Sequence, residues 1–296
     1  MTAHNPAAAF YASPAVRGVA ALLRGLHRVS PALGTRMALG LFFTPVPTKW
    51  LARSRAVPRP WVERRMPFEG GHVSVWQRSD VPPGAPKVLL THGWAGDAQQ
   101  LRPLADTLAV AGFDPVLLDL PAHGRSGGWR SNLLQWTRAL FAVTARFGPW
   151  DGVVAHSLGA LAMSHALARG LPARHAALIA LAPPPALFLR WFAQAMGTPE
   201  SLAAGMRSRV EAREGVSLGL FEPAWLGERV AQPTLLVHDR GDATAPLAGS
   251  ETLLTGLPAG RLHVTEELGH RRLLNDPGVM QQVLAHLSTT ASLKAV

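Results

Sequence analysis

Ser157 stands in a segment whose residue types and spacing suit nucleophilic catalysis. An apolar run that begins at Val153 precedes it, a helix-like stretch follows it, and the small residues Ala155 and Gly159 flank it at a distance of two. A serine on a sharp strand-to-helix turn needs small neighbours there, because larger side chains would clash with adjacent chain. The string is a relaxed form of G-x-S-x-G, with alanine in first place. It predicts a nucleophile at Ser157, although serine in such a string can also simply cap a helix.

The same chemistry requires a base beside the serine and an acid that fixes the tautomer of that base. The chain offers both downstream, in the order serine, acid, histidine. The apolar run Thr234–His238 is followed by Asp239 and Asp242, and the last apolar run is followed by Gly269 and His270. We predict Asp242 as the acid, with Asp239 in reserve, and His270 as the base. The simpler alternative is that both aspartates are turn residues and the histidine is an exposed loop residue.

Acyl transfer also needs N–H donors for the oxyanion that develops in the transition state. The residue after the nucleophile, Leu158, is one candidate. The other should follow an early strand, where His92, Gly93 and Trp94 form the start of a glycine-containing loop. We therefore predict the backbone N–H groups of Trp94 and Leu158 as the oxyanion hole. The Trp94 side chain either walls the acyl pocket or simply packs. This mechanism needs no cofactor and no metal.

The elements that must position these residues alternate between short apolar runs and helical stretches, which indicates a mostly parallel sheet with helices on both faces. The expected strands are His72–Arg78 at an edge, Val88–Thr91, Val116–Asp119, Val153–Ser157, Ala177–Leu181, Thr234–His238 and Arg261–Thr265. The expected helices are Ala98–Ala111, Asn132–Phe147, Leu158–Arg169, Ala248–Leu257 and Val279–Leu287. The helical segment 183–230 interrupts this rhythm. It is either a lid over the site or additional core packing.

Composition bounds the remaining possibilities. With 296 residues, 48% of them hydrophobic, the chain can bury a core without disulfides, and the absence of cysteine excludes thiolate nucleophiles and thiolate metal sites. Residues 1–65 hold ten Lys or Arg and one acid, a net +9 that leaves only +1 for the rest. The nearly neutral body argues against a nucleic-acid partner. We expect a basic, partly helical arm over 1–65, a catalytic domain over 66–296 and a cytoplasmic location.

The arm contains a basic amphipathic helix over 13–29, but no apolar run approaches the roughly 18 to 20 residues of a membrane span. Such an arm can contact an anionic membrane peripherally, although a solvated arm with a few anchoring apolar residues is the simpler interpretation.

Five motifs, taken together, resemble the α/β-hydrolase superfamily over roughly Val73 to the C-terminus. They are His92-Gly93-Trp94, Asp119-Leu120-Pro121-Ala122-His123-Gly124-Arg125-Ser126, Ala155-His156-Ser157-Leu158-Gly159, His238-Asp239-Arg240-Gly241-Asp242 and Gly269-His270. The resemblance, to the serine esterase-like branch, implies the same nucleophile, acid, base and oxyanion donor at Trp94. It also implies that His92, His123 and His156 support loop geometry.

The expected function is hydrolysis of an ester-like small-molecule acyl substrate through an acyl-enzyme on Ser157. A serine at this position argues against the dehalogenase and epoxide-hydrolase branches, which need a carboxylate there. A thioesterase, an amidase or a carbon–carbon bond hydrolase would use the same triad, so these alternatives stay open. A catalytically silent binding protein at a membrane surface is an alternative of another class. Substrate, chain length and oligomeric state do not follow from the sequence.

Overall fold

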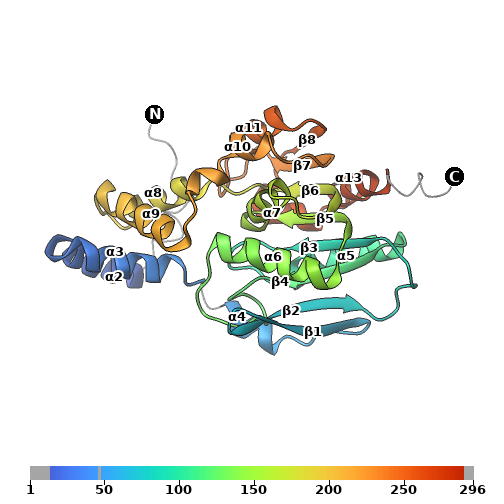
Figure 1. Cartoon of the computed structure of the whole chain (residues 1–296), viewed down its shortest axis with the longest axis horizontal. Coiled ribbons are helices and arrows are strands. Elements are labelled where there is room, and N and C mark those ends of the chain that lie inside the picture. Colours follow the sequence, from blue (N-terminus) through green and yellow to red (C-terminus); the bar gives the residue numbers. More distant parts are fainter. Residues whose placement is uncertain (1–13, 46–47, 290–296) are drawn as a thin grey trace. The chain divides into compact units, whose positions relative to one another are not determined.

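The structure, a computed structural model, describes residues 14–45 and 48–289. Its centre is an eight-stranded sheet with the order β1-β2-β4-β3-β5-β6-β7-β8 (Figure 1). Pairing is antiparallel between β1 and β2 and between β2 and β4, and parallel between all other neighbours. The strands are β1 (Trp61–Phe68), β2 (Gly71–Arg78), β3 (Lys87–Thr91), β4 (Asp114–Asp119), β5 (Trp150–His156), β6 (Ala173–Ile179), β7 (Thr234–Asp239) and β8 (Gly260–Thr265). The predicted α/β class is confirmed.

The edge strand predicted at His72–Arg78 is wrong in position, because β2 lies second in the sheet and β1 forms the edge. The apolar alternation of β1 is too weak to predict a strand, because its exposed or half-exposed centre holds Glu63, Arg64 and Arg65. Only Trp61 and Met66 of this strand are buried. Charged residues are common on an edge strand, where they discourage pairing with other chains. The expected boundary between residues 65 and 66 therefore falls inside a strand.

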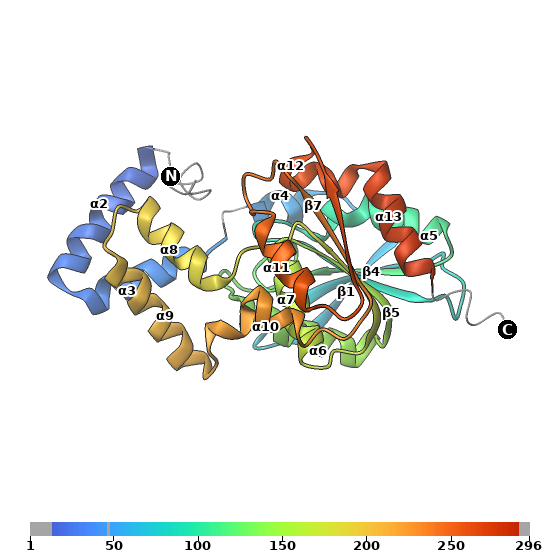
Figure 2. The same ribbon diagram turned by 90° about the horizontal axis from the view of Figure 1, so that it is seen from above.

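Helices cover both faces of the sheet, as Figure 2 shows: α5 and α13 lie on one side, and α6 and α7 lie on the other. The sheet belongs to a compact unit made of the described residues in 45–182 and 223–296. The helical elements of this unit are α4 (Thr48–Ser54), η1 (Ala98–Leu101), α5 (Arg102–Val110), α6 (Leu133–Phe147), α7 (Leu158–Ala168), α10 (Pro223–Gly227), α11 (Ala248–Gly256), α12 (Gly269–Arg272), η3 (Leu273–Asn275) and α13 (Pro277–Ser288). All five helices predicted from the alternating pattern are present, although the first begins with a 3₁₀ turn, η1.

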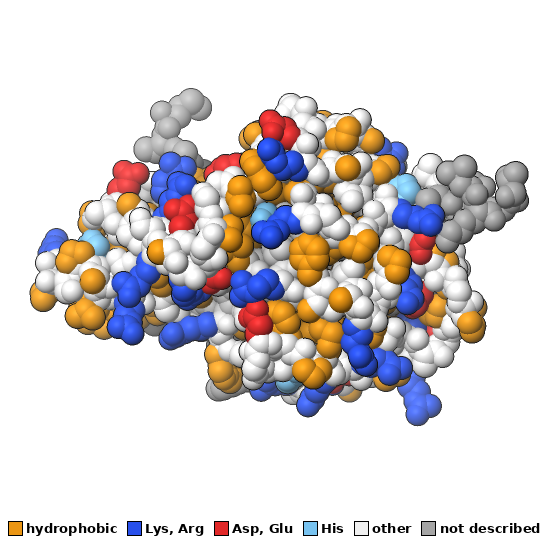
Figure 3. Space-filling view, in the orientation of Figure 1, with side chains coloured by type: hydrophobic (Ala, Val, Ile, Leu, Met, Phe, Trp, Pro, Cys, Tyr) orange, Lys and Arg blue, Asp and Glu red, His pale blue; other side chains and the backbone are white. Residues whose placement is uncertain are grey.

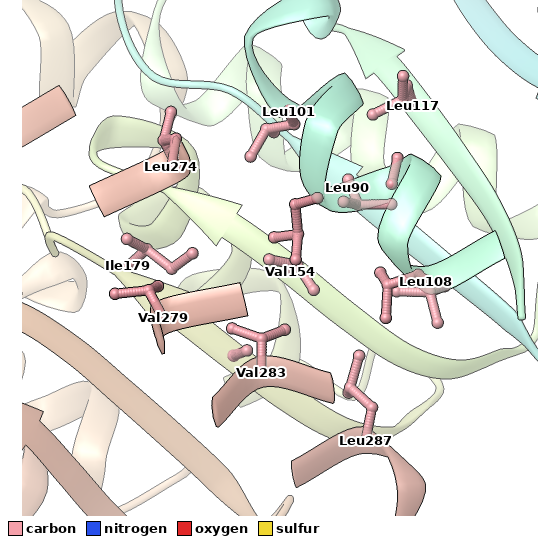
Figure 4. Packing of buried hydrophobic residues seen from close by; sticks show 14 of the residues in the cluster. Leu90, Leu101, Leu108, Leu117, Val154, Ile179, Leu274, Val279, Val283 and Leu287 are labelled. Carbon is pink, nitrogen blue, oxygen red and sulfur yellow. The ribbon is translucent and has the colours of Figure 1, made fainter. Parts of the chain in front are cut away.

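The core between the sheet and the α5–α13 layer consists mostly of branched aliphatic side chains (Figure 4). Leu90, Val154 and Ile179 come from the strands, and Leu108 and Val283 come from the two helices; all five are fully buried. Burying one such side chain contributes about 1.5–3 kcal/mol. This packing holds β3, β5 and β6 in fixed register, and their carboxyl ends therefore open at one edge of the sheet.

A second compact unit consists of the described residues up to Thr44 and of Pro183–Glu222. It contains α2 (Pro14–Val29), α3 (Pro31–Phe42), α8 (Pro185–Ala195), α9 (Glu200–Glu214) and η2 (Leu218–Phe221). The N-terminal helices share a core with the helical insertion: Phe42 stacks edge-on against Phe192, and the Arg24 guanidinium donates to the Met196 carbonyl oxygen at 2.9 Å. The sequence had placed these two segments in separate parts of the protein. No helix of the described residues is long and apolar enough to cross a membrane.

Candidate active site

Ser157 lies on a strained turn between β5 and α7, with φ 55° and ψ −123°. A non-glycine residue in this region costs on the order of 1–3 kcal/mol, so surrounding contacts must hold it there. The Ser157 N–H donates to the Ile179 carbonyl oxygen at 2.9 Å. A Cβ atom at Gly159 would lie only 2.2 Å from the His92 carbonyl oxygen, so that position requires glycine. Ala155 fits fully buried at the relaxed position of the motif.

Three side chains that are distant in sequence form one hydrogen-bonded chain at this turn. His270 Nε2 lies 2.9 Å from Ser157 Oγ, and His270 Nδ1 lies 2.7 Å from Asp242 Oδ2. The Asp242 side chain is fully buried, whereas the His270 side chain is 12% exposed to solvent. The structure thus brings together the predicted nucleophile, base and acid, with both distances inside hydrogen-bond range.

The Asp242 carboxylate is held as an ionised acceptor. Its Oδ1 accepts the backbone N–H groups of Thr244 at 2.7 Å and Ala245 at 2.9 Å, which leaves Oδ2 for His270. Burial alone would raise the pKa of Asp242, but the hydrogen bonds from His270 and from these two N–H groups outweigh burial, so its pKa lies below the ordinary value. An ionised acid fixes the tautomer in which Nδ1 of His270 carries the proton and Nε2 is free to act as a base.

Asp239, the reserve candidate, is directed elsewhere. Its carboxylate accepts the Gly241 N–H at 2.9 Å, the Thr265 hydroxyl at 2.8 Å and the Leu268 N–H at 2.9 Å. These bonds tie the end of β7 to the end of β8 and to the loop that carries His270. Asp239 therefore helps to position the loop that carries His270, and its hydrogen bonds do not involve the His270 ring.

His156 and His238 are two supports of this arrangement. His156 Nε2 lies 2.9 Å from the His270 carbonyl oxygen, and the two rings lie 4.8 Å apart. His238 Nε2 lies 2.9 Å from the carbonyl oxygen of Ala245, the residue whose N–H donates to Asp242. The supporting role of His156 matches the role that the sequence motifs imply for it, whereas His238 belongs to the fourth motif without any role that the sequence predicts.

The predicted oxyanion donors occupy suitable positions next to the nucleophile. Leu158 is the first residue of α7, so its N–H has no acceptor within the helix. Gly93 approaches the serine so closely that a Cβ atom there would lie 2.7 Å from the Ser157 Cβ, and Trp94 follows directly. His92 fixes this loop: its Nε2 accepts the Leu120 N–H at 3.1 Å, and its Nδ1 donates to the Gly93 carbonyl oxygen at 2.7 Å.

The Trp94 side chain packs against His123, with ring centroids 4.9 Å apart, and against Trp136 at 5.8 Å. His123 is itself fixed by a bond of 2.9 Å between its Nδ1 and the Pro121 carbonyl oxygen. An aromatic cluster therefore supports the loop that carries the second candidate donor. Among the described residues, no group of three or more His, Asp or Glu side chains is arranged to hold a metal ion.

The buried histidines near the site predict a loss of stability in mild acid. Burial lowers the pKa of His156 to about 3, helped by the neighbouring His270, and burial likewise lowers the pKa of His123 to about 3, helped by His92. In the unfolded chain both titrate near 6.5, so folding is favoured above that pH and loses support as the pH falls below it. Between pH 7 and pH 5 each histidine should remove about 2 kcal/mol of stability.

Thermal unfolding measured across this pH range tests the prediction. The His156→Gln variant retains an amide donor for the His270 carbonyl but cannot titrate. Its unfolding should therefore take up about one proton fewer, and its stability should depend on pH less steeply. Equal pH slopes for this variant and the unchanged protein would show that His156 titrates in the folded protein as it does in the unfolded chain, which would contradict the prediction.

Comparisons with known proteins agree with this fold. A family model of the alpha/beta hydrolase fold matches residues 86–229. Pimeloyl-acyl-carrier-protein methyl ester esterase from Aromatoleum aromaticum is 29% identical over 240 residues, which cover 65% of this chain and 94% of that protein.

Two solved structures share the fold at low identity. One is the thioesterase domain from the curacin biosynthetic pathway, with 17% identity and a TM-score of 0.57, covering 77% of this chain and 99% of its own. The other is a loop variant of a haloalkane dehalogenase from Bradyrhizobium elkanii, with 15% identity and a TM-score of 0.60. That match covers 79% of this chain and 99% of the dehalogenase chain. Together with the eight-stranded sheet and its helices, these matches show that the chain has the α/β-hydrolase fold.

Proposed function

We propose that the protein is a serine hydrolase that cleaves a carboxylic ester-like substrate through an acyl-enzyme on Ser157. The observation that carries this proposal is the unbroken chain from Ser157 Oγ through His270 to Asp242, at 2.9 Å and 2.7 Å. The ester class is supported by the similarity to a protein named as a methyl ester esterase.

The reaction begins when Ser157 Oγ attacks the ester carbonyl carbon while His270 Nε2 takes the hydroxyl proton. Charge then develops on the carbonyl oxygen, where the N–H groups of Trp94 and Leu158 donate to it. Collapse of the tetrahedral species expels the alcohol, which receives its proton from His270. Water, deprotonated by the same nitrogen, then attacks the acyl-enzyme and releases the acid. Asp242 stays ionised throughout and stabilises the imidazolium that forms twice.

The same residues would serve a thioesterase, an amidase or a carbon–carbon bond hydrolase, since the triad activates Ser157 without selecting the leaving group. The structural likeness to a thioesterase domain concerns the fold alone. A catalytically silent binding protein would have no need for the 2.9 Å and 2.7 Å bonds that hold His270 in a reactive tautomer. We therefore rank ester hydrolysis first.

A fluorophosphonate probe, combined with a short series of p-nitrophenyl esters, tests the proposal. We expect the purified protein to be labelled and to hydrolyse the esters, and Ser157→Ala to lose both properties. The matched control is Ser164→Ala on α7, whose hydroxyl donates only to the Ala160 carbonyl oxygen at 2.8 Å and which should be labelled normally. Absence of labelling in folded protein would favour the binding alternative, and faster turnover of matched thioesters would favour the thioesterase.

A further inference from the structure

The outward faces of α2 and α3 carry an unusual share of the exposed apolar surface. Of seven large hydrophobic side chains exposed among the described residues, four lie between residues 22 and 41. They are Leu22 at 62% exposure, Val29 at 86%, Leu33 at 50% and Leu41 at 38%. Apolar groups gathered in this way mark surfaces that contact something else, whereas single exposed hydrophobic residues are ordinary.

This exposed face does not hold the helical unit together, because the opposite faces of α2 and α3 do so. Leu23 and Ala38 are fully buried, and Thr35 lies beside α9, where a Cβ atom at Gly205 would be 3.0 Å from its Oγ1. His27 Nε2 lies 3.3 Å from Ser201 Oγ. The outward residues are therefore not the ones that form the core of the unit, and folding alone does not explain why their exposed parts are apolar.

Basic side chains border the apolar ones on both helices. Residues three or four positions apart share a helix face, which places Leu22, Gly25 and Val29 in one stripe of α2, with Arg17 and Arg28 beside it. On α3, Arg36 and Leu33 are likewise three apart, and both are exposed. No acidic residue precedes Glu63 in the chain. Figure 3 shows hydrophobic and basic side chains intermingled over this pair of helices.

We propose that this face, defined by Arg17, Leu22, Arg28, Val29, Leu33 and Arg36, docks onto an anionic lipid bilayer. Leucine and valine side chains enter the boundary between headgroups and acyl chains, while the guanidinium groups pair with lipid phosphates. Charge complementarity selects this occupant: two copies of the face would bring six guanidinium groups together without a compensating acid. An uncharged bilayer would satisfy the apolar residues but not the arginines.

Vesicle co-sedimentation of the full chain tests the proposal. The protein should bind vesicles of phosphatidylcholine mixed equally with phosphatidylglycerol, bind phosphatidylcholine alone far less, and be released as salt rises. Because each arginine near an anionic surface strengthens binding about fivefold, the variant Arg17→Glu/Arg28→Glu/Arg36→Glu should lose binding by more than about a hundredfold. The variant Leu22→Ser/Val29→Ser/Leu33→Ser should lose at least about tenfold.

A variant that should bind vesicles more tightly is included because misfolding can explain a loss of binding but not a gain. At Gly25 an added Cβ atom would meet nothing within 4 Å, and leucine favours a helix more strongly than glycine does. Gly25→Leu should therefore fold at least as well as the unchanged protein and bind anionic vesicles several-fold more tightly. Val110→Ser, at a residue 91% exposed on α5, is the matched control and should bind normally.

Three outcomes would overturn the proposal. They are no binding of the unchanged protein to phosphatidylglycerol vesicles, binding that is equal in the arginine variant and the unchanged protein, and no gain in Gly25→Leu. A dimer in solution that the serine variant converts to monomer, without vesicle binding, would assign the face to a second copy of the chain. Ester hydrolysis in solution should be unchanged in all these variants, which separates this proposal from the proposed reaction.

Discussion

Ser157→Ala is expected to lower kcat for a p-nitrophenyl ester by a factor on the order of 10⁶, and His270→Ala by a similar factor. The physical reason is that the two residues act as one unit: Ser157 Oγ has no base without His270 Nε2, 2.9 Å away, and that nitrogen has no proton to accept without the hydroxyl. The double variant should therefore be no slower than either single variant. Its residual activity would come from the oxyanion donors and from substrate binding.

Steady-state kinetics on the three variants, with enzyme concentration corrected for folded protein, give this comparison. His263→Ala, at a half-buried histidine of β8, is the matched histidine control and should keep kcat within a few-fold. Independent losses that multiply in the double variant would mean that Ser157 and His270 do not cooperate in one step, and the proposed mechanism would then be wrong.

The site was predictable from sequence because parallel strands deliver their carboxyl ends to one edge of a sheet. Ser157 follows β5, Asp242 follows β7 and His270 follows β8, in a sheet where β5 to β8 are consecutive neighbours. Chain order and the local motifs were therefore enough to place the three side chains near one another. Choosing Asp242 over Asp239 needed only the wider motif, and the geometry agrees with that choice.

Other features could not be predicted because they depend on contacts between distant residues that carry no local pattern. The strand β1 is an edge strand with charged residues, so its apolar alternation is too weak to recognise. The packing of α2 and α3 against α8 and α9 joins segments far apart in the sequence, as in the bond from Arg24 to Met196, which are 172 positions apart. The bond from His156 to the His270 carbonyl likewise has no sequence signal.

Asp242→Asn and Asp239→Asn should differ strongly in their effect on kcat, although both replace an aspartate of the same loop by its amide. Asp242→Asn is expected to lower kcat by about 10³–10⁴-fold. The amide can still accept the Thr244 and Ala245 N–H groups, but it no longer supplies the negative charge that holds His270 in its reactive tautomer. Asp239→Asn should instead destabilise the fold.

The stability loss in Asp239→Asn follows from its three acceptor bonds, to Gly241, Thr265 and Leu268, within fully buried surroundings. Removing the charge from such a buried acceptor should cost about 1–3 kcal/mol. Its kcat, measured well below the melting temperature, should fall far less than that of Asp242→Asn, since Asp239 touches the loop of His270 and not its ring. Chemical denaturation gives the first quantity and ester turnover the second. The reverse pattern, with Asp239→Asn stable but inactive and Asp242→Asn active, would transfer the role of the acid to Asp239.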